Sequence, residues 1–200
     1  MSDTIIYIDI SGSVSDFLNY WNKVDEIVSL NKDAFFFVWD TEIKEISYKE
    51  ILKYIENKKG YGGTKISSVA SSIINKKFSD KNIIIITDGE VSAVDVKSSE
   101  FILKDFNIKE VECHIIKSYV YSDDIDISVP LAFMRNNTSK LYYTNPQNIT
   151  KLIKNINKDD YKILENITLN DLMANFDMIY DLINITNMAN QVFHISNKNY

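Results

Sequence analysis

The isoleucine run Ile83–Ile86 sets the first limit on the fold of this chain. A segment that is apolar at every position has no polar face, so it fits a strand buried on both sides beneath helices, as in parallel sheets. Other β-branched or aromatic runs of strand length lie at Thr4–Ile8, Ala34–Trp39, Ile43–Ser47, Val111–Lys117 and Lys140–Thr144, and the isoleucines belong to the run Asn82–Thr87. The sequence therefore predicts a sheet covered by helices.

Apolar residues at three- and four-residue spacing predict helices between most of these strands, over Val14–Leu30, Ile66–Phe78, more weakly Val91–Phe106, and about Gln147–Ile156. Ser13 is a candidate cap for the first helix. Asp40 and Thr41 separate two strand-like runs too closely for a crossover helix, so these runs are predicted to form a hairpin.

This order predicts an α/β fold, a Rossmann-like three-layer α/β/α open sheet that is mainly parallel with one antiparallel edge strand. With 200 residues, 45% of them hydrophobic, the chain can bury one good core. We expect one domain over residues 1–158. Such sheets bind ligands at the carboxyl ends of their strands, where successive helices go to opposite faces.

Residues 159–200 are predicted to form a helical extension packed on or next to this domain. Apolar residues recur there at helical spacing, at Leu169, Leu172, Met173, Phe176, Ile179, Tyr180 and Ile183. An extra packed helix is the simpler interpretation, and a regulatory or partner-binding helix is the alternative.

Composition narrows the function classes. No apolar run approaches the roughly 20 residues that span a bilayer, and the first residues lack the pattern of a signal peptide, so we expect a soluble, cytoplasmic protein without a membrane span. The formal net charge of -6 argues against nucleic acid as the partner. Cys113 is the only cysteine, which excludes an internal disulfide or a thiolate metal cluster.

The five glycines fall in three short segments, SGSVS, KGYGGTK and TDGE. Glycine permits tight loops and close backbone approach, so this clustering indicates loops built around something. Two of the segments follow the predicted strands Thr4–Ile8 and Asn82–Thr87, which places them at carboxyl ends of strands. The same segments contain five oxygen-bearing residues, Asp9, Ser11, Ser13, Thr64 and Asp88.

Hydroxyl and carboxylate oxygens without nearby His or Cys suit a hard divalent cation. Mg²⁺ is the best fit, Mn²⁺ is possible, and Ca²⁺ is less favoured. Ser11 and Ser13 can turn their hydroxyls toward one ion, and Thr64 arrives from a separate loop. Asp9 and Asp88 can supply negative charge directly or through water.

These segments resemble the three parts of the metal-ion-dependent adhesion site (MIDAS) of von Willebrand factor A domains, including integrin I domains. The matching residues are DISGS at Asp9–Ser13, GGT at Gly62–Thr64 and TDG at Thr87–Gly89. VWD at Val38–Asp40 and LYYTNP at Leu141–Pro146 also resemble family segments. The resemblance covers roughly residues 3–157 and extends over the motifs in the family's order.

The resemblance implies that Ser11, Ser13 and Thr64 are ion-coordinating hydroxyls and that Asp9 and Asp88 hold the ion mainly through water and second-shell bonds. It further implies that a protein partner supplies a carboxylate to the open coordination position. Small intracellular relatives often work beside an AAA+ ATPase or other assembly machinery. We therefore expect a metal-dependent protein–protein interaction module and not an enzyme.

Two other function classes stay open. A metal-dependent phosphoryl-transfer or hydrolytic enzyme would use Asp9 and Asp88, but position 11 is Ser where a haloacid-dehalogenase-like phosphatase has its general acid. KGYGGTK also does not supply the GxxxxGK[ST] of a P-loop. The third class is a structural domain that keeps the fold and binds nothing through an ion.

Several other residues have simpler explanations than a site. Asp40 fits a hairpin-turn residue, and His114 fits a hydrogen-bonded core histidine. Cys113 is expected to be a small buried hydrophobe, and His194 lies near the chain end. The acidic patch Asp123, Asp124 and Asp126 fits a solvated loop better than a second cation site.

Overall fold

The computed structural model describes residues 2–117, 129, 132–133, 138–145 and 148–156. The predicted extension over residues 159–200 lies outside them. In chain order the elements are β1 (Thr4–Asp9), the 3-10 turn η1 (Gly12–Val14), α1 (Leu18–Leu30), β2 (Phe35–Trp39), β3 (Ile43–Ile46), α2 (Tyr48–Asn57), α3 (Ile66–Asn75), β4 (Asn82–Thr87), α4 (Ala93–Leu103), β5 (Glu110–Ile116), β6 (Thr138–Thr144) and β7 (Thr150–Ile156).

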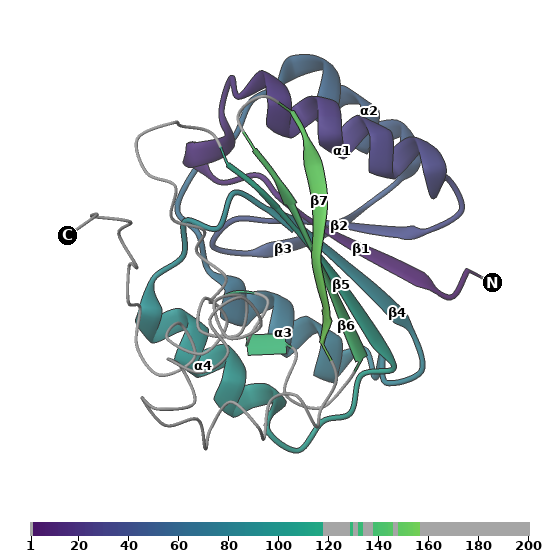
Figure 1. The fold of residues 1–200 in the computed structure, drawn as a ribbon, viewed down its shortest axis with the longest axis vertical. Coiled ribbons are helices and arrows are strands. Elements are labelled where there is room, and N and C mark those ends of the chain that lie inside the picture. Colours follow the sequence, from purple (N-terminus) through teal and green to yellow (C-terminus); the bar gives the residue numbers. More distant parts are fainter. Residues whose placement is uncertain (1, 118–128, 130–131, 134–137, 146–147, 157–200) are drawn as a thin grey trace, which may run out of the picture.

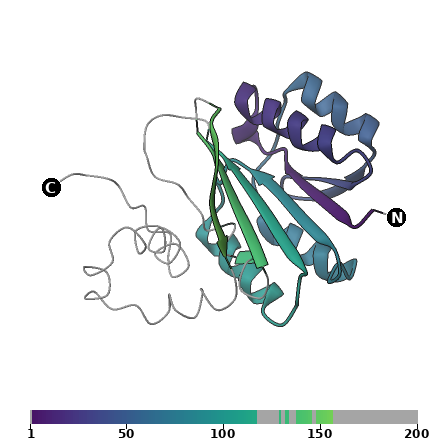
Figure 2. The same ribbon diagram turned by 45° about the vertical axis from the view of Figure 1, so that its right-hand side comes forward.

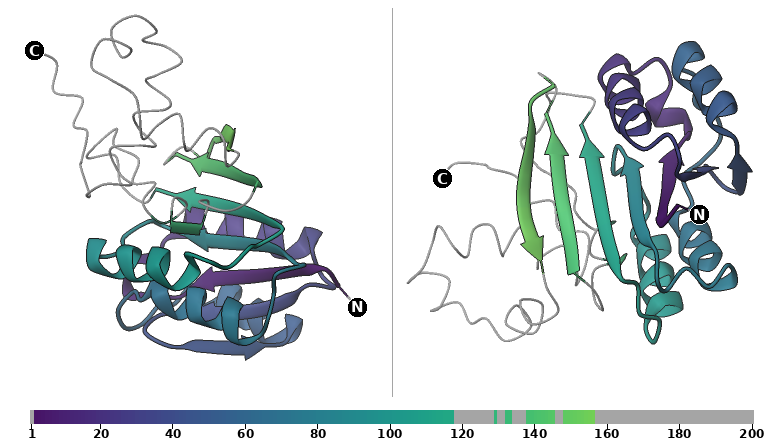
Figure 3. Two further views of the ribbon diagram at one scale, coloured as in Figure 1. Left: turned by 90° about the horizontal axis from the view of Figure 1, so that it is seen from below. Right: turned by 90° about the vertical axis from the view of Figure 1, so that its right-hand side faces the viewer.

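The strands form one seven-stranded sheet in the order β3-β2-β1-β4-β5-β6-β7, and the right view of Figure 3 shows β7, β6, β5 and β4 side by side. The inner strands β2, β1, β4, β5 and β6 pair in parallel, whereas β3 and β7 are antiparallel to their neighbours. The predicted open, mainly parallel α/β sheet is confirmed. The predicted antiparallel edge strand is β3, and a second antiparallel strand, β7, lies at the opposite edge.

Helices cover both faces of the sheet. Figures 1 and 2 show α1 and α2 on one face and α3 and α4 on the other. The isoleucines of β4 alternate between the two cores that result: Ile83 and Ile85 pack in the core beneath α3 and α4, and Ile84 and Ile86 pack in the core beneath α1 and α2. The run is therefore buried on both sides, as its lack of a polar face predicts.

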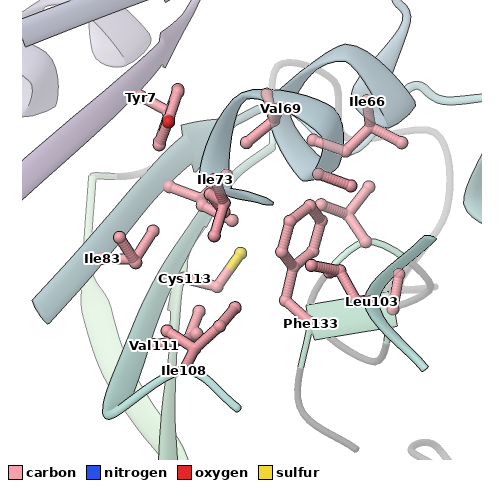
Figure 4. Close-up of a cluster of buried hydrophobic side chains, with 14 of the residues drawn as sticks. Tyr7, Ile66, Val69, Ile73, Ile83, Leu103, Ile108, Val111, Cys113 and Phe133 are labelled. Atoms are coloured by element: carbon pink, nitrogen blue, oxygen red, sulfur yellow. The ribbon is translucent and has the colours of Figure 1, made fainter. Parts of the chain in front are cut away.

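The core beneath α3 and α4 is shown in Figure 4. Cys113 of β5 lies there among apolar side chains that include Ile73 and Val111. It is fully buried, and burial raises the pKa of its thiol, because the thiolate would lose its hydration. The expectation of a small buried hydrophobe at this position is confirmed.

The helix predicted over about Gln147–Ile156 was wrong, because residues Thr150–Ile156 form the strand β7. A tight turn brings the chain back beside β6: Asn148 has a φ of 62°, and the Asn145 side chain accepts a 2.8 Å hydrogen bond from the backbone N–H of Ile149. Asparagine tolerates the left-handed conformation and closes such turns with its side chain. The pairing of Tyr143 with Lys151 then continues the sheet.

Two helical segments also differ from the prediction. The first helix begins at Leu18, not Val14, and Ser13 does not cap it, because Phe17 is the N-terminal capping residue. The helix α2 was missed, although Ser47 and Glu50 form a capping box that the sequence displays as S-x-x-E. The other two helices agree within a few residues.

The topology places the site. The helix α1 follows β1 onto one face, α4 follows β4 onto the opposite face, and β1 and β4 are neighbours in the sheet. Ligands of open α/β sheets bind at this kind of switch point, outside the carboxyl ends of the strands. The polar residues that follow these two strands occupy that position.

Candidate metal centre

Asp9 ends β1 and is fully buried. Its Oδ1 atom accepts a 2.8 Å hydrogen bond from the backbone N–H of Ser11, and its Oδ2 atom accepts a 2.7 Å hydrogen bond from Thr87 Oγ1. Thr87 ends β4, and its Oγ1 atom in turn accepts from the backbone N–H of Gly89. The Asp9 carboxylate therefore ties together the two strand ends and both of the loops that follow.

The two serine hydroxyls lie side by side. Ser11 precedes the turn η1 and Ser13 lies within it, and their Oγ atoms are 3.0 Å apart. Trp21 fixes the far end of this turn, since its indole N–H donates a 2.9 Å hydrogen bond to the carbonyl of Val14. Ser13 is thus engaged with Ser11 in the turn η1, well before α1 begins at Leu18.

Asp88 follows β4 and is 6% exposed. Its Oδ1 atom accepts a 3.0 Å hydrogen bond from the backbone N–H of Glu90. Its Oδ2 atom is buried and has no hydrogen-bond partner among the described residues. Buried polar atoms almost always have a partner, so an unsatisfied carboxylate oxygen here calls for an explanation.

Burial raises the pKa of both carboxyls. Loss of hydration and, second, the charge of Asp88 raise the pKa of Asp9 to about 7. Burial likewise raises the pKa of Asp88, and the Ser13 hydroxyl and the N–H of Glu90 oppose that change. Two buried carboxyls concentrate negative charge when they are ionised, and a divalent cation would neutralise it.

Thr64 is half-buried, and its loop is bound to the serine loop by backbone contacts. The N–H of Tyr61 donates to the carbonyl of Ile10 at 2.8 Å, and the N–H of Gly12 donates to the carbonyl of Gly62 at 3.2 Å. Thr64 follows two residues after that carbonyl. Asp9, at the end of β1, and the loops that carry the other four predicted residues therefore meet at the carboxyl ends of β1 and β4.

Tyr20 joins the carboxyl ends of β1 and β4, and the sequence analysis did not predict this role. Its hydroxyl is fully buried and donates to the backbone carbonyl of Asp9 at 2.6 Å, with a second contact to the carbonyl of Ile86 at 3.3 Å. One phenol therefore bridges β1 and β4 just below the two carboxylates. Nothing in the spacing of Tyr20 distinguishes it from a core aromatic residue of α1.

The simpler explanations hold for the residues set aside. Asp40 Oδ1 accepts a 2.9 Å hydrogen bond from the N–H of Glu42, which confirms its role in the hairpin turn. His114 is 6% exposed, lies 2.7 Å from Glu112 and stacks on Tyr142, which confirms a hydrogen-bonded core histidine. His194 and the acidic patch of residues 123–126 lie outside the described residues.

The described residues hold no cluster of three or more His, Cys, Asp or Glu side chains arranged for a metal ion. The candidate centre is of another kind, since it combines two carboxylates with three hydroxyls. The residues present fit a hard cation, because every available ligand is an oxygen and one buried carboxylate oxygen lacks a partner.

None of the helices in the described part of the chain is long and apolar enough to cross a membrane.

Comparison with known proteins identifies no family. No family model matches the sequence. No curated protein matches it either. Among solved structures, the chain is similar to proximal thread matrix protein 1 from the mussel byssus, with a TM-score of 0.39, 16% identity, and coverage of 84% of this chain and 69% of that chain. A likeness at this level carries no inference about function.

Proposed function

We propose that this chain is a divalent-metal-dependent protein interaction module of the von Willebrand factor A type, which binds an acidic residue of a partner protein. The unpartnered Oδ2 atom of Asp88 carries the proposal. It is buried at the edge where the Ser11 and Ser13 hydroxyls also meet. A group of oxygen atoms that includes an unsatisfied carboxylate is suited to a cation and poorly suited to an apolar ligand.

Each residue has a proposed role in holding the ion. Ser11, Ser13 and Thr64 would contribute hydroxyl oxygens. Asp88 would act through its unpartnered oxygen or through a water on it. Both oxygens of Asp9 already accept hydrogen bonds, which supports a role outside the direct ligands. Mg²⁺ suits this set best, Mn²⁺ is an alternative, and Ca²⁺ fits less well.

When bound, the cation supplies an open coordination position that attracts a carboxylate. Without the cation, the negative charges of the buried Asp9 and Asp88 would repel a partner's carboxylate, so binding of an acidic residue should require the metal. An intracellular setting, beside an AAA+ ATPase or other assembly machinery, belongs to the same proposal and rests on the family resemblance.

One observation favours an enzyme instead. Asp9 has a pKa raised to about 7, and perturbed carboxyls are typical of acid–base catalysts. Asp9 is fully buried, however, and both of its oxygens already accept hydrogen bonds, from Ser11 and Thr87, so the binding function is preferred. A phosphatase and nuclease screen with Mg²⁺ or Mn²⁺ decides: turnover that disappears in Asp9→Ala would replace the binding proposal with an enzyme.

Titration calorimetry with Mg²⁺ and Mn²⁺ tests the metal site directly. The full chain should bind the ion, and Ser11→Ala and Asp88→Ala should each weaken binding about 10-fold or more. Ser98→Ala is the matched control, because the Ser98 hydroxyl only donates to a carbonyl within α4. Absence of binding by the parent chain would remove the metal site from consideration.

A pull-down with and without chelator tests the partner. Proteins captured only with Mg²⁺, and not by Thr64→Ala bait, would be the expected partners. Capture that ignores both the chelator and the substitution would show that another surface of the domain does the binding.

A further inference from the structure

A groove of about 490 Å³ lies between α2 and the loop that carries Thr64. Pockets of this size accommodate side chains of a bound ligand. The α2 side presents residues at helical spacing, and the full lining consists of Glu50, Lys53, Tyr54, Asn57, Lys59 and Tyr61. Two of these residues connect the groove to the candidate metal centre. The backbone N–H of Tyr61 donates a hydrogen bond to the carbonyl of Ile10, and Lys59 forms an ion pair with Asp16, which follows the turn η1.

Tyr61 is an exposed aromatic ring on a fixed backbone. Its side chain is 64% exposed, while its N–H donates to the carbonyl of Ile10 and the preceding residue, Gly60, is buried. Tyr54 lines the same groove and packs partly against the core beneath α1 and α2. Rigid aromatic side chains beside a binding site are typical anchors for a partner's side chain.

The charges of the groove favour an acidic ligand. Lys53 and Lys59 both line it, in a chain whose formal net charge is -6. Glu50 is the one carboxylate of the lining, and the hydrogen bonds that it accepts from Ser47 lower its pKa and keep it ionised, so two lysines stand against one negative charge. The Lys59 pair with Asp16 is exposed, so a ligand's carboxylate can exchange with it at little cost.

We propose that this groove binds an aromatic side chain from the same partner segment whose carboxylate completes the metal site. Further acidic residues of that segment lie near Lys53 and Lys59. The partner is therefore an extended peptide that places an aromatic residue at a fixed short spacing from its metal-bound acidic residue. This inference rests on the proposed function and specifies the ligand of that same site.

Selection from a random peptide-display library tests it. The immobilised full chain is exposed to the library in Mg²⁺, and bound members are eluted with chelator. Selected peptides should pair an acidic residue with an aromatic one at constant spacing. Selection on Tyr61→Ala should retain the acidic residue and lose the aromatic preference. Phe101→Ala is the matched control, because Phe101 is 79% exposed on α4, across the sheet from α2, and should leave both preferences intact.

Affinity measurements with a selected peptide then show how much its aromatic residue contributes to binding. Replacing its aromatic residue with Ala should weaken binding to the parent chain on the order of 10-fold and change binding to Tyr61→Ala by less than about 2-fold. Lys53→Glu should reduce the enrichment of acidic residues beyond the one bound to the metal.

The outcomes separate the two proposals. Without any chelator-sensitive enrichment, both the proposed function and the groove are wrong. Enrichment of acidic residues with no aromatic preference, or an aromatic preference that persists in Tyr61→Ala, overturns the groove alone and leaves the metal-dependent module standing.

Discussion

Gly60 lies so close to Ser11 that a β-carbon on Gly60 would come within 1.9 Å of the Ser11 carbonyl oxygen. No side chain fits there, and the oxygen belongs to rigid backbone. This approach holds the loop carrying Thr64 against the loop carrying the two serines. The loop of Thr64 and the loop of the two serines therefore pack against each other through backbone atoms.

Gly60→Ala should therefore separate these loops and weaken Mg²⁺ binding about 10-fold or more, because Thr64 moves relative to Ser11. Gly63→Ala is the matched control: a β-carbon there meets only a methyl group of Thr41, at 3.4 Å, which is ordinary contact. Calorimetry on both variants checks this. Equal Mg²⁺ affinity for the two would show that the close approach does not position Thr64.

Asp88→Asn should stabilise the metal-free protein and abolish its stabilisation by Mg²⁺. The substitution removes a buried charge whose Oδ2 atom has no partner, and it relieves repulsion on Asp9. We expect the free energy of unfolding in chelator to rise by on the order of 1 kcal/mol. Urea unfolding with chelator and with Mg²⁺ measures both effects. A variant that loses stability in chelator would contradict the repulsion.

The raised pKa of Asp9 predicts a pH dependence for the metal-free protein. The unfolded carboxyl titrates near 4 and the folded one near 7, so the folded state holds the extra proton between those values. The free energy of unfolding should therefore fall as pH rises from about 4 to about 7. Asp9→Asn should lack this slope, which isolates it from carboxyls elsewhere.

Mg²⁺ should bind with proton release in the same pH window, because the ion favours the ionised carboxyl. The apparent affinity should thus increase from pH 5 to pH 7. Calorimetry in two buffers of different ionisation enthalpy counts the protons. An affinity that is independent of pH would mean that Asp9 is already ionised in the metal-free fold.

Tyr20→Phe should lower the free energy of unfolding by roughly 1 to 3 kcal/mol, because two buried carbonyls lose their donor. It should also weaken Mg²⁺ binding several-fold, since those carbonyls belong to Asp9, the last residue of β1, and to Ile86, the residue before the last of β4. Tyr7→Phe is the control, because the Tyr7 hydroxyl bonds Ser72 on the other face of the sheet. That variant should lose stability alone, and a matching loss of Mg²⁺ affinity would deny Tyr20 any positioning role.

Local patterns predicted most of the sheet and failed where a turn decided the structure. The strand β4 follows from its own isoleucines, because a fully apolar run has one suitable environment in this fold. The strand β7 does not follow from its residues, which fit a helix as well. The turn at Asn148 brings these residues beside β6, and pairing with β6 makes them a strand.

The sequence by itself placed Asp9, Ser11, Ser13 and Asp88 at the carboxyl ends of two strands and Thr64 in a separate loop, since residue patterns are local and strand ends can be recognised one at a time. Only the tertiary structure decided how their oxygens are used. Thr87 reaches Asp9 across 78 positions of the chain and occupies its Oδ2 atom, while the Oδ2 atom of Asp88 is left without a partner. Hydrogen-bond partners so distant in sequence depend on strand order and packing, which no local pattern records.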